Sequence, residues 1–135
     1  MTLDIWYTSV WDKLEEIVKT VIPNTVQGSR DLITSFPGCA IIPGAIEPIA
    51  TTPERSNYLT TFEVVVGVEG TTPTDSLKQA LGYANKILEK IANNRDLSHI
   101  VDNTEVTRLT PEFERLPQYL RCWTHIIIQC RTVRR

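Results

Sequence analysis

Apolar side chains recur every three or four positions near the start of the chain, and this spacing predicts an amphipathic helix over residues 3–20. The apolar stripe consists of Leu3, Trp6, Val10, Leu14, Ile17, Val18 and Val21. Pro23 follows the helix and cannot continue it. Residues 24–36 show little periodicity and contain Gly, Ser, Asn and Thr. We therefore expect them to form a functional loop or a partly disordered segment.

The middle of the chain has the pattern of strands separated by turns. Residues 39–42 are a short apolar run between Pro37-Gly38 and Pro43-Gly44, which predicts a brief strand. Residues 45–49 are expected to be extended at a sheet edge, because Pro48 cannot donate a ladder hydrogen bond. Residues 58–68 are dominated by β-branched and aromatic side chains and predict a long strand. One face of that strand carries Phe62, Val64, Val66 and Val68.

A second helix is predicted over residues 73–92 by its cap as well as by its periodicity. Thr72 stands at the N-cap, Pro73 at the first helical position, and Asp75 where its carboxylate can reach back to the capping amide. The apolar face of this helix consists of Leu77, Ala80, Leu81, Ala84, Ile87, Leu88 and Ile91.

The last part of the chain predicts a closing pair of strands. Residues 105–109 form the first, residues 111–117 a polar connection, and residues 119–133 the final strand. The core face of the final strand carries Leu120, Cys122, Ile126, Ile128 and Cys130. We expect one α+β domain over residues 1–135, in which two helices pack on one face of a mainly antiparallel sheet.

Composition narrows the function classes. The 135 residues carry a formal charge of −2, so the chain as a whole is not a basic nucleic-acid binder, and sequence-specific nucleic-acid binding is not expected. All sixteen acidic residues lie at or before Glu114 and five arginines follow it, which makes the C-terminal end a local positive pole. No apolar run approaches the length of a membrane span, and no signal peptide is visible, so we expect synthesis and function on the cytoplasmic side. The three cysteines are expected to be reduced and mostly buried.

Three groups of residues have the residue types of a catalytic or ligand-binding site, but each is better explained as ordinary loop or turn structure. Ser98-His99 beside Asp96 has the residue types of a hydrolase triad, but no G-x-S-x-G nucleophile turn is present. The glycines at 67 and 70 precede a helix without the Lys-Ser/Thr ending of a phosphate loop. Glu112 and Glu114 are expected to be solvated in a polar linker. We therefore predict no catalytic residue, no cofactor and no enzymatic activity.

A metal site is likewise not expected on the final strand. Cys122 and His125 lie three residues apart, so a regular strand turns them to opposite faces. Cys122 and Cys130 share a face but are separated by roughly 26 Å of strand. His125 is interpreted as a residue of the sheet surface.

Candidate interface residues stand outside the predicted core. Trp11 and Trp123 lie off the core faces of their elements, and large aromatic residues often anchor subunit contacts. The polar segments 25–35 and 51–57 are expected to reach a neighbouring subunit. The predicted subunit interface consists of Trp11, Gln27, Arg30, Pro53, Arg55, Trp123, His125 and Arg131.

The order of these elements resembles that of tail-terminator (tail completion) proteins of long-tailed bacteriophages. The resemblance rests on the N-terminal helix, the segment Ser35-Phe36-Pro37-Gly38-Cys39-Ala40-Ile41-Ile42-Pro43, the strand Leu59-Thr60-Thr61-Phe62-Glu63-Val64-Val65-Val66, the second helix and the closing β-pair. It implies a non-enzymatic virion subunit, assembled in the host cytoplasm. Such a subunit forms a hexameric ring on the head-proximal end of the tail tube, ends tube polymerisation and contacts the neck. No functional residue is carried over by motif.

Two alternatives to a tail terminator remain open. The first is a head-completion or connector subunit of the same neck. The second is a cytoplasmic α+β domain that binds a small ligand or acts as an enzyme.

Overall fold

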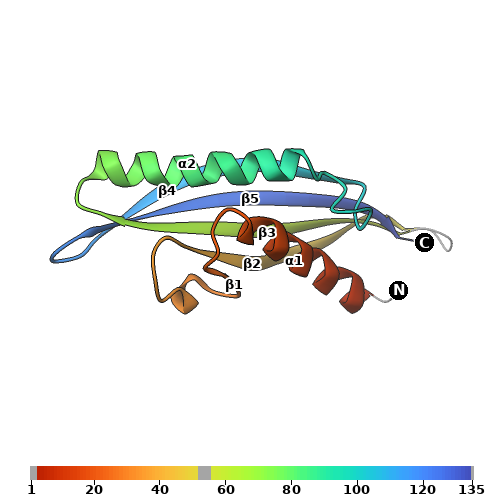
Figure 1. The fold of residues 1–135 in the computed structure, drawn as a ribbon. Helices are drawn as coiled ribbons and strands as arrows, with labels where there is room; N and C mark the ends of the chain where they lie inside the picture. Colours follow the sequence, from red (N-terminus) through yellow and green to blue (C-terminus); the bar gives the residue numbers. More distant parts are fainter. Residues whose placement is uncertain (1–2, 52–55, 135) are drawn as a thin grey trace.

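A computed structural model describes residues 3–51 and 56–134 as a twisted five-stranded sheet with two helices (Figure 1). The elements in chain order are α1 (Leu3–Lys19), β1 (Thr25–Gln27), the 3₁₀ helix η1 (Arg30–Leu32), β2 (Gly38–Thr51), β3 (Ser56–Gly70), α2 (Pro73–Ala92), β4 (Asn103–Arg115) and β5 (Leu120–Arg134). The strand order is β1-β2-β3-β5-β4. The pairing of β1 with β2 is parallel and all the other pairings are antiparallel.

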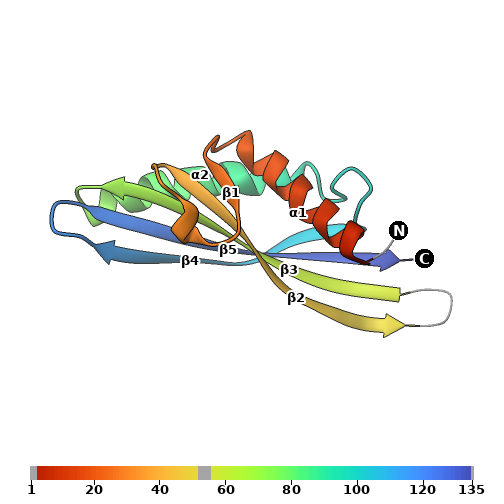
Figure 2. The same ribbon diagram turned by 90° about the horizontal axis from the view of Figure 1, so that it is seen from below.

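Both helices lie on the same side of the sheet, as expected from their single apolar stripes (Figure 2). This helix-covered side is called the inner face below, and the opposite side the outer face. The inner face of β3 contributes Phe62, Val64 and Val66, and that of β5 contributes Ile126 and Ile128, all fully buried. The predicted fold class and the predicted core faces of these two strands are confirmed.

The helix predictions hold closely. The α2 helix begins after Thr72, whose hydroxyl accepts a hydrogen bond from the amide of Asp75 at 3.2 Å. In α1, Trp6 is buried as predicted, and its indole N–H donates to the carbonyl of Ile100 at 3.0 Å. None of the helices within residues 3–51 and 56–134 is long and apolar enough to cross a membrane. The three cysteines are free and buried, as predicted.

Two strands are longer than predicted, because edge positions tolerate proline. The brief strand and the extended segment expected over 39–49 are one strand, β2, with register shifts after Pro43 and after Pro48. Most of residues 111–117, which were expected to form a connection, belong to β4. This edge strand of the sheet continues through Pro111 to Arg115. Beyond the helices, β2 and β3 extend as a pair up to Thr51 and Ser56 (Figure 2).

The largest difference concerns residues 24–36, which are neither a free loop nor disordered. Thr25–Gln27 pairs with β2, η1 follows, and the segment folds over the outer face. There, Ile33 and Phe36 pack with Ala40, Val65 and Trp123 as a second, smaller core. Trp123 lies off the inner-face core as predicted, but it is only 4% exposed and belongs to this second core, so it is not open to a partner as a surface anchor would be. The reason is that the chain supplies its own cover for this part of the outer face.

Candidate functional site

A row of charged side chains crosses the outer face from β3 to β4. Its centre is His125 on β5, which lies opposite Val65 on one side and Thr110 on the other. Alternation along β5 turns the odd-numbered residues 121–131 to the outer face, as the sequence predicts. His125 is therefore a sheet-surface residue as expected, but its ring is fully engaged by neighbouring strands.

The imidazole of His125 lies between two carboxylates. Its Nδ1 contacts Oε1 of Glu63, and its Nε2 contacts Oε2 of Glu112 at 2.6 Å. Ionised carboxylates only accept hydrogen bonds, so both contacts are satisfied when both ring nitrogens carry protons. The hydrogen bond from His125 lowers the pKa of Glu112, against the opposing effect of desolvation, and the nearby Arg30 lowers it further.

Arg30 connects this row to the segment that covers the outer face. Its Nη1 donates to Oε2 of Glu112 at 3.1 Å, and its guanidinium carbon lies 4.9 Å from the centre of the Trp123 ring. Phe36 meets the same indole edge-on, with ring centres 5.6 Å apart. We call Arg30, Glu63, Glu112, Trp123 and His125 the outer-face cluster. It fastens residues 26–36 across β3, β5 and β4.

A second arginine, Arg121, forms ion pairs on the outer face near the turn between β4 and β5. Arg121 contacts Glu69 at 3.2 Å and Glu114 at 3.4 Å. Its guanidinium carbon lies 4.7 Å from the centre of the Phe36 ring. Glu112 and Glu114 form ion pairs on a strand, so the prediction that they lie in a linker is wrong, although their side chains remain 48% and 39% exposed to solvent.

The hydrogen bonds and ion pairs among these groups limit their chemistry. The two carboxylates that approach His125 bind opposite nitrogens of the ring, so they do not converge on a common point. Among the residues that the structure describes, no three His, Cys, Asp or Glu side chains are arranged to hold a metal ion. The arrangement suits fastening and surface recognition.

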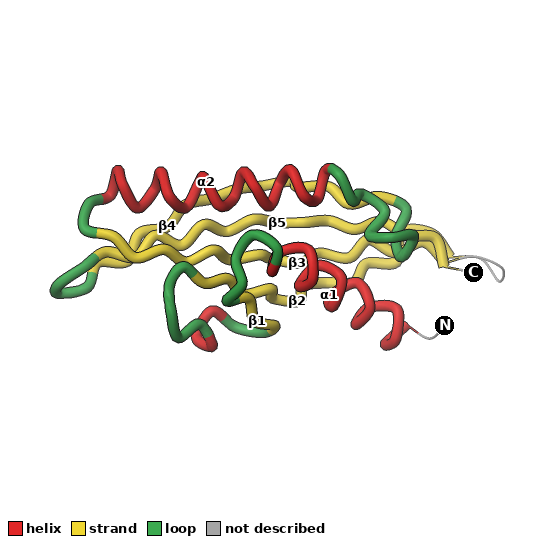
Figure 3. The backbone as a smooth tube through the Cα atoms, in the orientation of Figure 1, coloured by secondary structure: helices red, strands yellow, loops and turns green. Residues whose placement is uncertain are grey.

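The polar turn at residues 96–99 does not assemble a triad. Leu97, Ser98 and His99 have positive φ angles of 47°, 59° and 71°, within the connection between α2 and β4 (Figure 3). His99 contacts Asp96 at 3.0 Å, but its side chain is 92% exposed. The structure shows a left-handed turn at this position, with the Leu97 side chain buried and the His99 side chain exposed.

The predicted interface residues are dispersed over the molecule. Trp11 is half-buried and donates its indole N–H to the carbonyl of Ile41 at 3.0 Å. Gln27 donates to Asp12 at 2.7 Å, and Arg131 lies exposed on the outer face of β5. Pro53 and Arg55 lie outside the described residues.

The structure brings together three of these predicted residues, Arg30, Trp123 and His125, in the outer-face cluster. Sequence reasoning missed Glu63 and Glu112. The available signal was the alternation of glutamates at 112 and 114, which has the period of a strand.

Comparisons with known proteins add the following. No family model matches the chain, and no curated protein matches it. One solved structure without a descriptive name aligns over 96% of this chain and 96% of its own, at 16% identity and a TM-score of 0.47. Another, described as the virion of a native gene transfer agent particle, aligns over 90% of this chain and 91% of its own, at 9% identity and a TM-score of 0.44. These are distant likenesses, and they assign no residue a role.

Proposed function

We propose that this chain is a structural subunit of a phage-like particle that forms a ring, hexameric in the family it resembles, on the head-proximal end of a tail tube. The ring ends tube polymerisation and offers a surface to the neck. The observation that carries the proposal is the order and placement of the elements. The N-terminal helix, the segment entering β2, the long β3, the capped α2 and the closing β4–β5 pair follow the order on which the resemblance rests.

The shape of the sheet supports a role in assembly. β4 is a 13-residue edge strand, and β2 and β3 project beyond the helices at one end (Figure 2). A long edge strand and a projecting strand pair are surfaces on which another chain can pair, although Pro111 and the charged residues of β4 restrict where such pairing can occur. A ring covers both kinds of surface on every subunit.

The side-chain chemistry of the outer face supports the same role. Residues of the types that transfer protons are held by their neighbours: His125 is hydrogen-bonded to Glu112, and Glu112 also pairs with Arg30 in the segment that covers the outer face. These contacts hold the outer face in one conformation, as the subunit of a non-enzymatic ring requires.

Polymerisation of a tail-tube protein from the same genome as this chain tests the proposal. The tube protein is assembled with and without the purified chain, and tube lengths and tube ends are measured by electron microscopy. We expect tubes of limited length, each with a ring at one end. Unchanged lengths and bare tube ends would contradict the proposal. Binding to isolated portal or connector particles instead of tubes would favour a head-completion subunit.

A further inference from the structure

The ring of His125 connects the two strands that flank β5 on the outer face. Its Nδ1 contacts Glu63 on β3, and its Nε2 contacts Oε2 of Glu112 on β4 at 2.6 Å. The same oxygen of Glu112 accepts a hydrogen bond from Nη1 of Arg30 at 3.1 Å. When the imidazole is protonated, these contacts form a row of alternating charges from β3 through β5 and β4 to η1.

The number of protons on the imidazole decides how many of these contacts are hydrogen bonds. An imidazolium donates from both ring nitrogens, whereas a neutral imidazole donates from one and presents a lone pair at the other. In either neutral tautomer, one of the two carboxylates faces a lone pair and has no shared proton. The positive charge between Glu63 and Glu112 is lost at the same time, so the carboxylates repel each other across the ring.

The charges around the ring come from the elements that pack beside it. β3 supplies Glu63, β4 supplies Glu112, and η1 supplies Arg30. On β2, the positions that pair with Val65 and Glu63 are both apolar. Arg108, on the outer face of β4, is exposed and carries a positive charge that opposes a protonated ring. The charged groups in direct contact with the ring are the two carboxylates.

The indole N–H of Trp123 reports whether residues 26–36 cover the outer face. Glu112 fixes Arg30, whose guanidinium carbon lies 4.9 Å from the centre of the Trp123 ring. The indole Nε1–H is buried and has no hydrogen-bond partner among the described residues. Burial beneath the covering segment is therefore what shields this proton from solvent.

We propose that the outer-face cluster is a pH-dependent latch. Protonated His125 joins the two carboxylates, and through Glu112 it holds Arg30 and residues 26–36 against the sheet. Loss of one proton from the ring breaks this row of contacts and loosens the segment. The apolar contacts of the second core remain in both states, so the segment opens more often without unfolding. The latch belongs to the single subunit and does not depend on the proposed ring.

The composition of the chain makes the response of His125 separable from that of other groups. The chain contains two histidines, and the other, His99, is 92% exposed in the connection between α2 and β4 (Figure 3). Burial raises the pKa of Cys39 to about 12 and that of Cys130 to about 11, so these thiols stay protonated near neutral pH. Burial raises the pKa of Cys122 as well.

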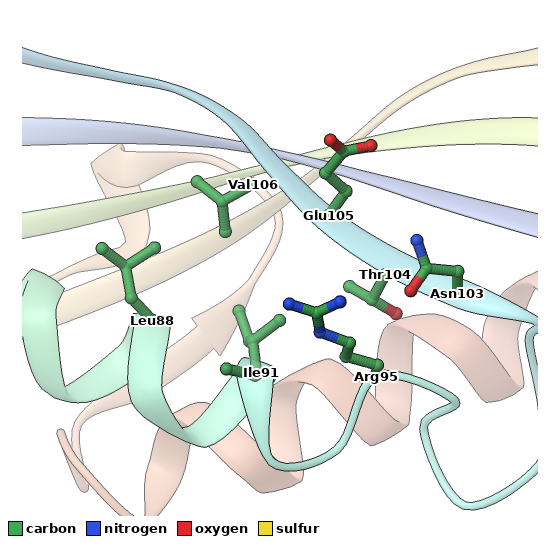
Figure 4. Close-up of a pocket in the computed structure, with 8 residues that line it drawn as sticks. Leu88, Ile91, Arg95, Asn103, Thr104, Glu105 and Val106 are labelled. Atoms are coloured by element: carbon green, nitrogen blue, oxygen red, sulfur yellow. The ribbon is translucent and has the colours of Figure 1, made fainter.

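The cavity of the inner face holds no histidine or cysteine. It measures about 300 Å³ and lies between α2 and β4, with Leu88 and Ile91 on the helix side (Figure 4). Arg95 and Glu105 bring opposite charges to its lining, and none of the described residues that line it is a histidine or a cysteine. Its ionisable groups are therefore not of the type that changes charge between about pH 5 and about pH 8.

Hydrogen exchange of the Trp123 indole N–H, followed by NMR at about pH 5.5 and about pH 8.5, tests the proposal. Division by the intrinsic exchange rate at each pH gives a protection factor. We expect the protection of the natural chain to fall about fivefold at the higher pH, which corresponds to about 1 kcal/mol, the net contribution of one hydrogen bond. The indole N–H of Trp6, which donates to the carbonyl of Ile100 at 3.0 Å, is the internal reference and is expected to keep its protection.

Three variants assign the response, and circular dichroism establishes that each is folded. His125→Gln is uncharged at both pH values, and we expect its protection to be low and independent of pH. Glu63→Gln places an amide beside Nδ1 that can either accept or donate, so the contact survives deprotonation and the fall in protection should be mostly abolished. His99→Gln is the matched control and is expected to retain the full fall.

Equal protection of the natural chain at the two pH values would overturn the proposal. A full fall in His125→Gln or Glu63→Gln, or loss of the fall in His99→Gln, would also overturn it. Because the isolated subunit is measured, the result is independent of whether the chain caps tail tubes.

Discussion

Replacing Trp123 by alanine tests whether residues 26–36 cover the outer face of the sheet. The indole is 4% exposed, lies beneath the guanidinium of Arg30 and meets Phe36 edge-on. Truncating a buried tryptophan to alanine typically costs about 3–5 kcal/mol, from lost transfer energy and the cavity left behind. Against a total stability of about 5–15 kcal/mol for a domain, this is a large loss.

The phenylalanine variant at Trp123 separates packing from hydrogen bonding. The indole Nε1–H is buried and has no hydrogen-bond partner among the described residues. An unsatisfied buried donor costs about 1–3 kcal/mol, and phenylalanine removes it while keeping an aromatic ring in place. The smaller ring loses some contacts, so the two effects oppose each other. We expect Trp123→Phe to stay within about 1 kcal/mol of the natural chain.

Urea unfolding followed by far-UV circular dichroism measures both variants on the whole chain. We expect the Trp123→Phe variant to be about as stable as the natural chain, and the Trp123→Ala variant to be much less stable than either. If alanine costs less than about 0.5 kcal/mol, as a surface substitution does, residues 26–36 do not pack on the indole. If phenylalanine costs as much as alanine, the indole N–H makes a hydrogen bond that the structure does not show.

Three further predictions follow from single features of the fold. Ile128→Ala empties a fully buried inner-face position and is expected to cost about 2–5 kcal/mol in urea unfolding; a cost below about 0.5 kcal/mol would mean that the faces of β5 are reversed. The hydrogen bond from His125 lowers the pKa of Glu112 in the folded protein. The stability that this hydrogen bond contributes is therefore fully present above the ordinary carboxyl pKa, and it is lost as the pH falls through the lowered pKa of the folded state. Between about pH 6 and about pH 3 the natural chain should therefore lose more stability than the Glu112→Gln variant. Equal losses of stability in the two proteins would show that the pKa of Glu112 is not lowered in the folded protein. Thr72→Ala removes the acceptor of the Asp75 amide and is expected to cost about 1 kcal/mol, whereas Thr72→Ser should restore most of it.

The sequence predicts best where several local signals agree. Thr72, Pro73 and Asp75 place the start of α2 to the residue, because cap, proline and carboxylate act within one turn. The faces of β5 follow from plain alternation over fifteen residues. In both cases the information that fixes the structure lies within the element.

Prediction fails where the deciding contacts come from other strands. β1 has three residues, and its place depends on pairing with Cys39, Ala40 and Ile41 of β2. Pro111 indicates a break in a strand, yet β4 passes through it because the position lies in an edge strand. Neither pairing partner nor edge position can be known from the local pattern.

Gly67 shows how the outer face depends on such distant contacts. Alternation places this glycine on the outer face of β3, where a side chain would normally pack, and its register partner on β5 is Trp123. A Cβ at this position would lie 2.7 Å from Cζ3 of Trp123 and 2.8 Å from Cε1 of Phe36, so both rings occupy the space that the glycine leaves. The chain thereby closes this part of the outer face with its own residues 26–36.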